Sequence, residues 1–260
     1  IYTIENPAIV GATFKDVVLG LPNSCAIGIL KANGDTELNP SYASKIQKGE
    51  KIILIAEDDS LIQPYKPIND SFTLTNRDLI IEKDRLPIKL LILGWHESGN
   101  VLLNELDMQL PNGSSVLVAY NEEYIPSGMN LNEREINNIE IKFLSGLTHT
   151  RTFLEGIDLI GIDAIIILGY RTNIEIDEAD TLSLMSLVHL RSIADIQGTK
   201  LEIATELLDS SNRQIAERER SEDFIASENL ITMAMTQLVE NPELENIFNL
   251  ILTSAGPEFH

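Results

Sequence analysis

The chain has 260 residues, and 43% of them are hydrophobic, so it is long enough to bury more than one core. Its 19 Lys and Arg residues against 40 Asp and Glu residues give a formal net charge of −21, which excludes nucleic acid and anionic lipid as expected partners. This excess suits a cationic partner, and it also agrees with the ordinary solvation of an acidic protein. The single cysteine excludes an internal disulfide, and the apolar neighbours of Cys25 predict a buried thiol in a reducing compartment.

Two features of the chain bear on a membrane. No apolar run approaches the roughly 20 residues that a transmembrane helix needs, and there is no signal-peptide pattern, so we expect no direct membrane insertion of this chain. The sequence begins with Ile1 rather than Met and starts directly in strand-like residues. We therefore expect it to be part of a longer protein, whose remaining portion could span a membrane.

Residues 1–63 predict a small α+β lobe. Residues 13–19 indicate a short helix, and the apolar runs at residues 25–30 and 51–56 indicate strands. Asn33 and Gly34 form a hairpin-turn pair after the first of these strands. Residues 64–87 contain three prolines among polar and charged residues, which predicts a linker.

Residues 88–260 predict a Rossmann-like α/β domain with a doubly wound parallel sheet. Its first strand, residues 88–93, is almost wholly apolar and ends at Gly94, as expected of a strand that is buried on both faces and followed by a sharp turn into a helix. Apolar runs predict four more strands, and apolar periodicity predicts several helices. The strands lie at residues 115–120, 139–144, 164–169 and 200–208; the helices lie at 132–136, 152–157, 177–196, 211–220 and in two C-terminal segments between 223 and 253.

The turn after the first strand carries an incomplete nucleotide fingerprint. A G-x-G-x-x-G phosphate loop would place its three glycines at Gly94, His96 and Gly99, and the middle one is replaced by an imidazole. Asn121 and Glu122 stand at the tip of the second strand, where an acid would bind ribose hydroxyls. The missing glycine argues against a bound nucleotide. A loop histidine facing solvent is the alternative interpretation of His96, and solubility alone would also explain an acid at a strand end.

The sequence resembles the CASTOR/POLLUX (DMI-type) ion channel family. Residues 5–62 are similar to the C-terminal lobe of a regulator-of-conductance (RCK, Trk-C-like) domain, and residues 88–260 are similar to the N-terminal Rossmann lobe of a second one. The motifs that carry the second similarity are L-I-L-G-W-x-x-x-G at 91–99, G-S-S-V-L-V-A-Y-N-E at 113–122, D-A-I-I-I-L-G at 163–169, the helix at 177–193, A-T-E-L-L-D at 204–209, S-E-D-F-I-A-S-E-N-L-I-T-M-A from 221, and the final G-P-E-F-H. The resemblance implies two domains, 1–63 and 88–260 with C-terminal crossover helices, joined by a linker at 64–87.

The resemblance also implies a role and partners. In such channels a pore domain precedes the first RCK domain, and four chains form a tetrameric gating ring on the cytosolic face of a membrane. The expected partners are thus further copies of this chain and the N-terminal pore domain of the same full-length chain. The expected role is regulatory and not enzymatic.

The family resemblance implies Ca²⁺ as the regulator, and a hard cation prefers clustered carboxylate oxygens. Three groups of acids are candidates, each with a solvated acidic turn as the alternative: Glu206 with Asp209, Asp223, and the run Glu57, Asp58 and Asp59. The histidines lack zinc spacing, and no G-x-S-x-G motif supports a hydrolase. His189, within the long helix, is expected to be buried or at an interface.

Two other functions stay open at this point. A nucleotide-sensing regulatory subunit of a Trk-like potassium transporter would need a working pocket at residues 94–99. An NAD-dependent oxidoreductase would need that pocket and a large second domain as well.

Overall fold

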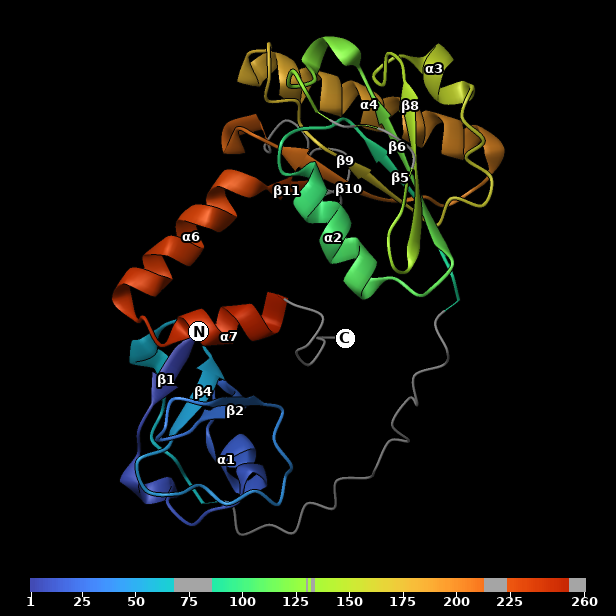
Figure 1. Cartoon of the computed structure of the whole chain (residues 1–260). Coiled ribbons are helices and arrows are strands. Elements are labelled where there is room, and N and C mark those ends of the chain that lie inside the picture. Colours follow the sequence, from blue (N-terminus) through green and yellow to red (C-terminus); the bar gives the residue numbers. More distant parts are fainter. Residues whose placement is uncertain (68–85, 130, 132–133, 213–223, 253–260) are drawn as a thin grey trace. The chain divides into compact units, whose positions relative to one another are not determined.

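The computed structural model describes residues 1–67, 86–129, 131, 134–212 and 224–252 (Figure 1). The chain splits into two compact units. The first comprises Ile1–Ile81 and Ala234–His260, and the second comprises Glu82–Met233. The prediction of one domain from residue 88 to residue 260 differs from this grouping at its C-terminal end, because residues 234–260 group with the first unit.

The first unit contains a four-stranded antiparallel sheet with the strand order β1-β4-β2-β3. Its strands are β1 (Tyr2–Ile4), β2 (Cys25–Leu30), β3 (Thr36–Leu38) and β4 (Lys51–Ile55); its helical segments are η1 (Pro7–Ile9), α1 (Phe14–Gly20), η2 (Asp59–Leu61) and α7 (Leu244–Leu252). Helix α1 begins at a capping box, in which Thr13 and Asp16 each bond the backbone N–H of the other. The predicted small α+β lobe is thus present.

Alternation along β4 buries both faces of this sheet. Ile52 and Leu54 pack into the core that includes α1, whereas Ile53 packs on the other face. That second face is covered by α7 through Leu244 and Ile247. The predicted burial of Cys25 was wrong: Cys25 is exposed, because it begins β2 before the buried positions of that strand.

The second unit contains a seven-stranded sheet with the order β11-β10-β9-β5-β6-β8-β7. All neighbours are parallel except β7 and β8. The strands are β5 (Lys89–Leu93), β6 (Ser114–Tyr120), β7 (Arg134–Glu135), β8 (Ile139–Ser145), β9 (Ala164–Ile167), β10 (Glu202–Leu207) and β11 (Phe224–Ala226); the helices are α2 (Gly99–Gln109), η3 (Glu122–Tyr124), α3 (Arg151–Glu155), α4 (Ile176–Gln197) and η4 (Ser210–Asn212). The boundary between the two units falls within helix α6 (Ser227–Glu240), after Met233.

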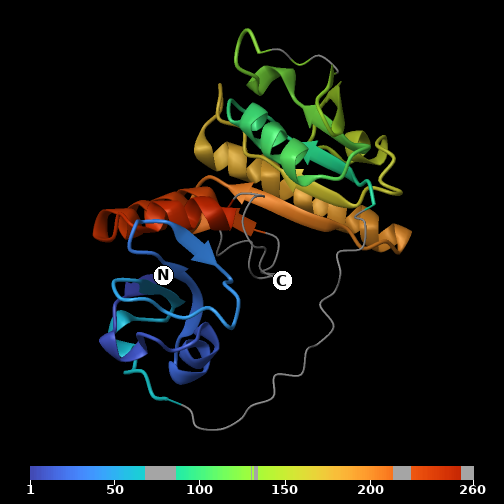
Figure 2. The same ribbon diagram turned by 60° about the horizontal axis from the view of Figure 1, so that its bottom comes forward.

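Helices cover this sheet on both faces, with α2 on one side and α4 on the other (Figures 1 and 2). Leu91 and Leu93 of β5 pack with α3 and α4, and Leu90 and Ile92 pack with α2. The chain runs from β5 outward through β6 to β8, then returns to β9 on the other side of β5. The direction therefore reverses between β5 and β9, which defines the topological switch point of a doubly wound sheet. The predicted Rossmann-like fold is confirmed.

One predicted helix was wrong. The segment 132–136 contains strand β7, which pairs antiparallel with β8 through Arg134 and Ile141. Most of the predicted helix at residues 211–220 lies outside the described residues. Among the helices that the structure describes, none combines the length and the apolar composition that a bilayer crossing requires.

Candidate functional site

The turn that leaves β5 requires glycine at its first position. Gly94 has a φ of +86°, and a Cβ there would collide with the carbonyl oxygen of Leu168 after β9. Its N–H donates to the carbonyl oxygen of Ala119, 2.9 Å away in β6. The turn is therefore held directly at the switch point, between the two strands that flank β5.

Trp95 fills the space beneath the loop at residues 94–99. Its side chain is fully buried, and a Cβ on Gly99 would lie 2.6 Å from the indole ring. The indole Nε1–H donates to Sδ of Met129 at 2.9 Å, and the ring meets Phe143 edge-on at 5.8 Å between centroids. Gly99 thus allows the start of α2 to pack closely on Trp95.

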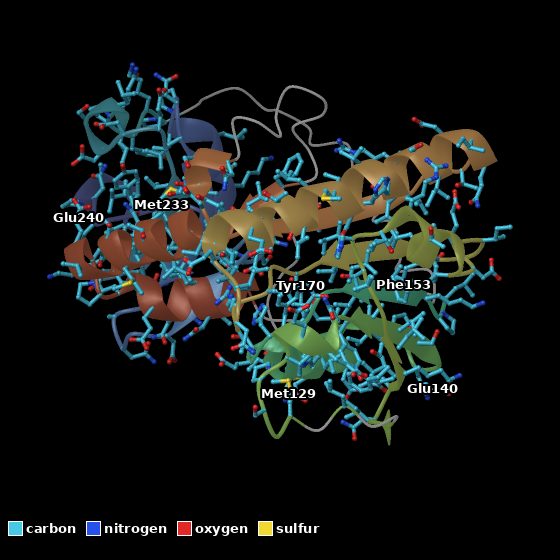
Figure 3. All side chains as sticks on the ribbon, turned by 90° about the horizontal axis from the view of Figure 1, so that it is seen from above. Met129, Glu140, Phe153, Tyr170, Met233 and Glu240 are labelled. Atoms are coloured by element: carbon cyan, nitrogen blue, oxygen red, sulfur yellow. The ribbon has the colours of Figure 1, made fainter. Side chains whose placement is uncertain are left out.

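Tyr170 crosses the carboxyl end of β5. It follows β9, yet its hydroxyl oxygen accepts a hydrogen bond from the backbone N–H of Asn121, at the end of β6, at 2.9 Å. The same hydroxyl lies 2.8 Å from Oγ1 of Thr148. Tyr170 is labelled in Figure 3. Since β5 lies between β9 and β6, this bond carries the ring over the strand end, and the cavity that Tyr170 lines with Gly94 has no room for a water molecule.

The predicted ribose position is occupied by internal bonds. The side chain of Asn121 accepts the N–H of Glu123 and begins η3, while its backbone N–H is taken by Tyr170. Glu122 is exposed beyond it. Among the described residues, Trp95 lies beneath the degenerate nucleotide loop and Tyr170 lies across the strand end beside it.

His96 makes a second contact across a strand end, at the same carboxyl edge of the sheet. The interpretation as a solvent-facing loop residue was wrong, because His96 is only 4% exposed. Its Nδ1 accepts the N–H of Ser98 at 3.2 Å, so the ring proton lies on Nε2, which faces Oε2 of Glu206 at 3.4 Å. Glu206 stands near the end of β10, so this contact passes over the end of β9.

Glu206 also binds the segment that follows β9. Arg171 donates to Oε1 of Glu206 at 2.6 Å, and the N–H of Gly169 donates to Oε2 at 3.1 Å. Burial alone would raise the pKa of the Glu206 carboxyl. The hydrogen bond from His96 and the charge of Arg171 outweigh burial and lower this pKa from 4.5 to about 2. The carboxylate is therefore ionised at neutral pH.

The other metal candidates make local contacts. Asp209 accepts the N–H of Ser211, which lowers the pKa of its carboxyl, and Asp58 accepts from the hydroxyl and N–H of Ser60. Glu57 and Asp59 are exposed. Asp223 lies outside the described residues. Within the described ranges, no group of three or more His, Cys, Asp or Glu side chains is arranged to hold a metal ion, so the Ca²⁺ site stays a prediction.

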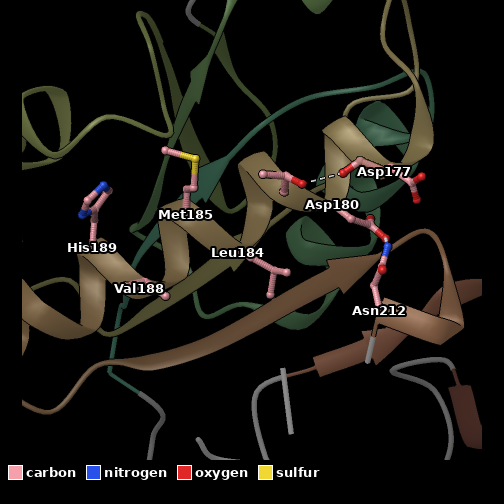
Figure 4. A pocket seen from close by; sticks show the side chains of 8 residues that line it. Asp177, Asp180, Leu184, Met185, Val188, His189 and Asn212 are labelled. Atoms are coloured by element: carbon pink, nitrogen blue, oxygen red, sulfur yellow. Dashed lines mark hydrogen bonds between the residues drawn. The ribbon is translucent and has the colours of Figure 1, made fainter. Parts of the chain in front are cut away.

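A groove of about 590 Å³ runs along α4 (Figure 4). Leu184, Met185 and Val188 line it, with the half-buried His189 at one end and Asp177 at the other. Asp180, which is buried, is held there by the N–H groups of Leu208 and Asp209 and by the amide of Asn212. This network ties the end of β10 to α4.

The sequence patterns missed Tyr170, Arg171 and Asp180. Tyr170 and Arg171 follow the predicted strand β9, and Asp180 of α4 faces the end of β10. Each of the three bonds residues of a different element, which the sequence pattern does not indicate. A polar residue directly after a buried strand was the only available indication of a role for Tyr170 and Arg171.

The fold and the site together define a class: a Rossmann-like α/β domain with a degenerate nucleotide loop, in a chain that also holds a small antiparallel lobe. Comparison with known proteins gives the particular relatives. A family model described as "Castor and Pollux, part of voltage-gated ion channel" matches residues 1–71. The predicted resemblance is confirmed, since the chain is similar to CASTOR/POLLUX ion channels over nearly its whole length.

Two of these relatives show how far the similarity extends. The probable ion channel POLLUX of Arabidopsis thaliana is 24% identical over 293 residues, covering 99% of this chain and 35% of the relative. The ion channel CASTOR of Lotus japonicus is 24% identical over 293 residues, covering 98% of this chain and 34% of the relative. This chain therefore spans about a third of the length of the curated relatives that it matches, and these relatives are ion channels, not enzymes.

Solved structures with partial similarity include domains of several kinds. The NAD(P)-binding domain of an exopolyphosphatase-related protein from Archaeoglobus fulgidus has a TM-score of 0.39 at 16% identity, over 58% of this chain and 96% of that one. The human SLO3 gating ring has a TM-score of 0.36 at 11% identity, over 53% of this chain and 24% of that one. The Shewanella denitrificans Kef C-terminal domain in its AMP-bound form has a TM-score of 0.39 at 14% identity, over 62% of this chain and 87% of that one.

Proposed function

We propose that this chain is the cytosolic, RCK-like regulatory region of a CASTOR/POLLUX-type cation channel. The observation that carries the proposal is the similarity to these channels along 97–99% of the chain, from the small lobe to the C-terminal helices. In this role the chain would assemble with three further copies into a gating ring and connect to a preceding pore domain. Ligand binding would open the pore only to the extent that the ligand prefers one ring geometry over the other.

The geometry of the carboxyl edge supports a regulatory role over a catalytic one. An oxidoreductase or a nucleotide sensor needs an open crevice at the loop of residues 94–99. Here Trp95 lies beneath the loop and Tyr170 lies across the end of β5. The same packing counts against the nucleotide-sensing subunit of a Trk-like transporter.

We propose Ca²⁺ as the regulating ligand. Support comes from the family resemblance, from the net charge of −21, and from exposed carboxylates at Glu57 and Asp59 that make no ion pair within the described residues. Asp209 and Asp223 are the candidates in the second unit. Hard carboxylate oxygens are the ligands that Ca²⁺ prefers.

Titration calorimetry of the 260-residue chain tests the ligand. We expect a saturable heat with Ca²⁺ that Mg²⁺ does not reproduce. Two double variants, E57Q/D59N and D209N/D223N, each remove one group of candidate ligands, and the heat should weaken in the variant whose acids bind the ion. The control E140Q removes an exposed acid of β8 outside both groups, and the heat should be unchanged in it. No saturable heat up to millimolar Ca²⁺ would remove the proposed trigger.

Assembly is tested separately by light scattering coupled to size exclusion. The gating-ring proposal expects a concentration-dependent mass that reaches four chains, in keeping with closed cyclic symmetry. A monomer at every concentration, with the chain folded by circular dichroism, would show that this region alone does not form the ring.

A further inference from the structure

The carboxylate of Glu206 lies where three hydrogen-bond donors from two separate strand ends converge. The loop after β5 contributes Nε2–H of His96, and the segment after β9 contributes the N–H of Gly169 and the guanidinium of Arg171. The side chains of His96 and Glu206 are 6% and 13% exposed, and that of Arg171 is 39% exposed. The carboxylate therefore occupies a largely enclosed position with access from the Arg171 side.

These donors are of the kinds that proteins use to bind external anions. An arginine fork, a neutral imidazole N–H and a backbone N–H each suit one oxygen of a carboxylate or phosphate. They also lie at the carboxyl edge beside the switch point, where doubly wound sheets bind ligands. In this chain, however, all three are directed at an oxygen of the protein itself.

We infer that this cluster is an anion-binding position that the chain fills with the Glu206 carboxylate, and that it binds a small external carboxylate once that side chain is removed. In the native chain the internal carboxylate closes the position, because a second negative charge there would meet Glu206 with only one guanidinium to offset both. The Glu206 carboxylate thus prevents external anions from binding to these three donors. The inference concerns this cluster alone and does not depend on the channel proposal.

Chemical rescue of the variant E206A tests the inference. The variant removes the carboxylate and leaves the three donors facing a space of carboxylate size. Because an unpaired buried cluster is destabilising, we expect the melting temperature of E206A to fall by roughly 5–10 °C. Sodium formate should restore part of that loss in a saturable way, whereas sodium chloride at equal ionic strength should not.

Three controls separate a specific site from a general salt effect. The wild-type chain should show no formate-specific shift, because the position is filled. E202A removes an exposed acid of the same strand, whose side chain is 69% exposed, and should behave as the wild type does. The double variant E206A/R171A should lose the rescue, because the main charged donor is gone.

Formate that stabilises the wild type as much as E206A, or fails to stabilise a folded E206A, would overturn the inference. If E206A does not fold in buffer, the yield of folded protein after refolding in formate, compared with chloride, becomes the measurement. A higher yield in formate supports the inference, and equal yields contradict it.

Discussion

At the scale of single residues, the three positions of the broken fingerprint have separate roles. Gly94 still allows the turn at the end of β5, as it would in a nucleotide-binding protein. Gly99, by contrast, faces the indole of Trp95, and the middle position carries His96, which is directed at Glu206. The loop is therefore a packing element that ties β5 to β10.

Gly94 and Gly161 provide a matched pair for testing this turn. Both have positive φ, +86° and +82°, but a Cβ at Gly161 would meet nothing within 4 Å. We expect G161A to lower the free energy of unfolding by about 1 kcal/mol, the cost of left-handed backbone alone. G94A should cost roughly 3 kcal/mol or more, because the Leu168 carbonyl must also move. Equal losses in urea unfolding would contradict the close approach.

Glu206 gives a pH dependence of defined sign. Its folded pKa, about 2, lies below its ordinary value of 4.5, so its contribution to stability is fully present above pH 4.5 and is lost as the pH falls towards 2. The contribution amounts to at most about 3 kcal/mol. We expect the stability of the wild type minus that of E206Q to shrink over this window. A difference that stays constant from pH 6 to pH 3 would contradict the internal ion pair.

At the scale of elements, apolar pattern was sufficient for the strands of the central sheet. Residues 88–93, 115–120 and 164–169 are largely apolar runs, as expected of strands in the middle of the sheet, whereas residues 139–144 alternate between buried apolar and exposed charged side chains; each of the four is a strand. The pattern failed at residues 132–136, because a two-residue edge strand is defined by its pairing with β8 and not by its own periodicity.

The candidate site was less predictable than the fold. The sequence indicated which residues stand at strand ends, including Gly94, Asn121 and Glu206. It could not indicate that Tyr170 would reach across β5, because that depends on the spatial order of strands. The same reason applies to His96, because its partner Glu206 lies in β10, more than a hundred residues away in the sequence.

Helix α7 offers a test of element packing within the first unit. Leu244 and Ile247 are buried against Leu30 and Ile53, and Lys51 bonds Glu243 at 2.6 Å. We expect I247A to lower the free energy of unfolding by about 2–4 kcal/mol through the cavity that it leaves. The matched control L252A truncates a side chain of the same helix that is 72% exposed, and it should change stability by less than about 0.5 kcal/mol.

If the two truncations have equal effects, α7 does not cover the sheet as described. Thermal unfolding with circular dichroism is sufficient to measure both. The result would also show whether the C-terminal helix must be retained when the small lobe is studied, since the two are separated by about 190 residues of sequence.

At the scale of the whole molecule, the chain joins a small antiparallel lobe and a Rossmann-like domain that have different tasks in the proposal. The parallel sheet supplies the scaffold, and at its carboxyl edge the described side chains of His96, Tyr170 and Glu206 bond residues of the same chain. The excess of 21 negative charges favours a cationic ligand and disfavours anionic ones at long range. The central claim is that this Rossmann-like scaffold no longer accepts a dinucleotide.

Trp95 allows this claim to be measured directly. It is the single tryptophan of the chain and lies beneath the loop that would bind a pyrophosphate. We expect titration with NAD⁺, NADH, ATP or AMP to leave the tryptophan emission and the melting temperature unchanged up to millimolar concentrations. A saturable change at micromolar concentration of any of these nucleotides, in the wild-type chain, would contradict the account.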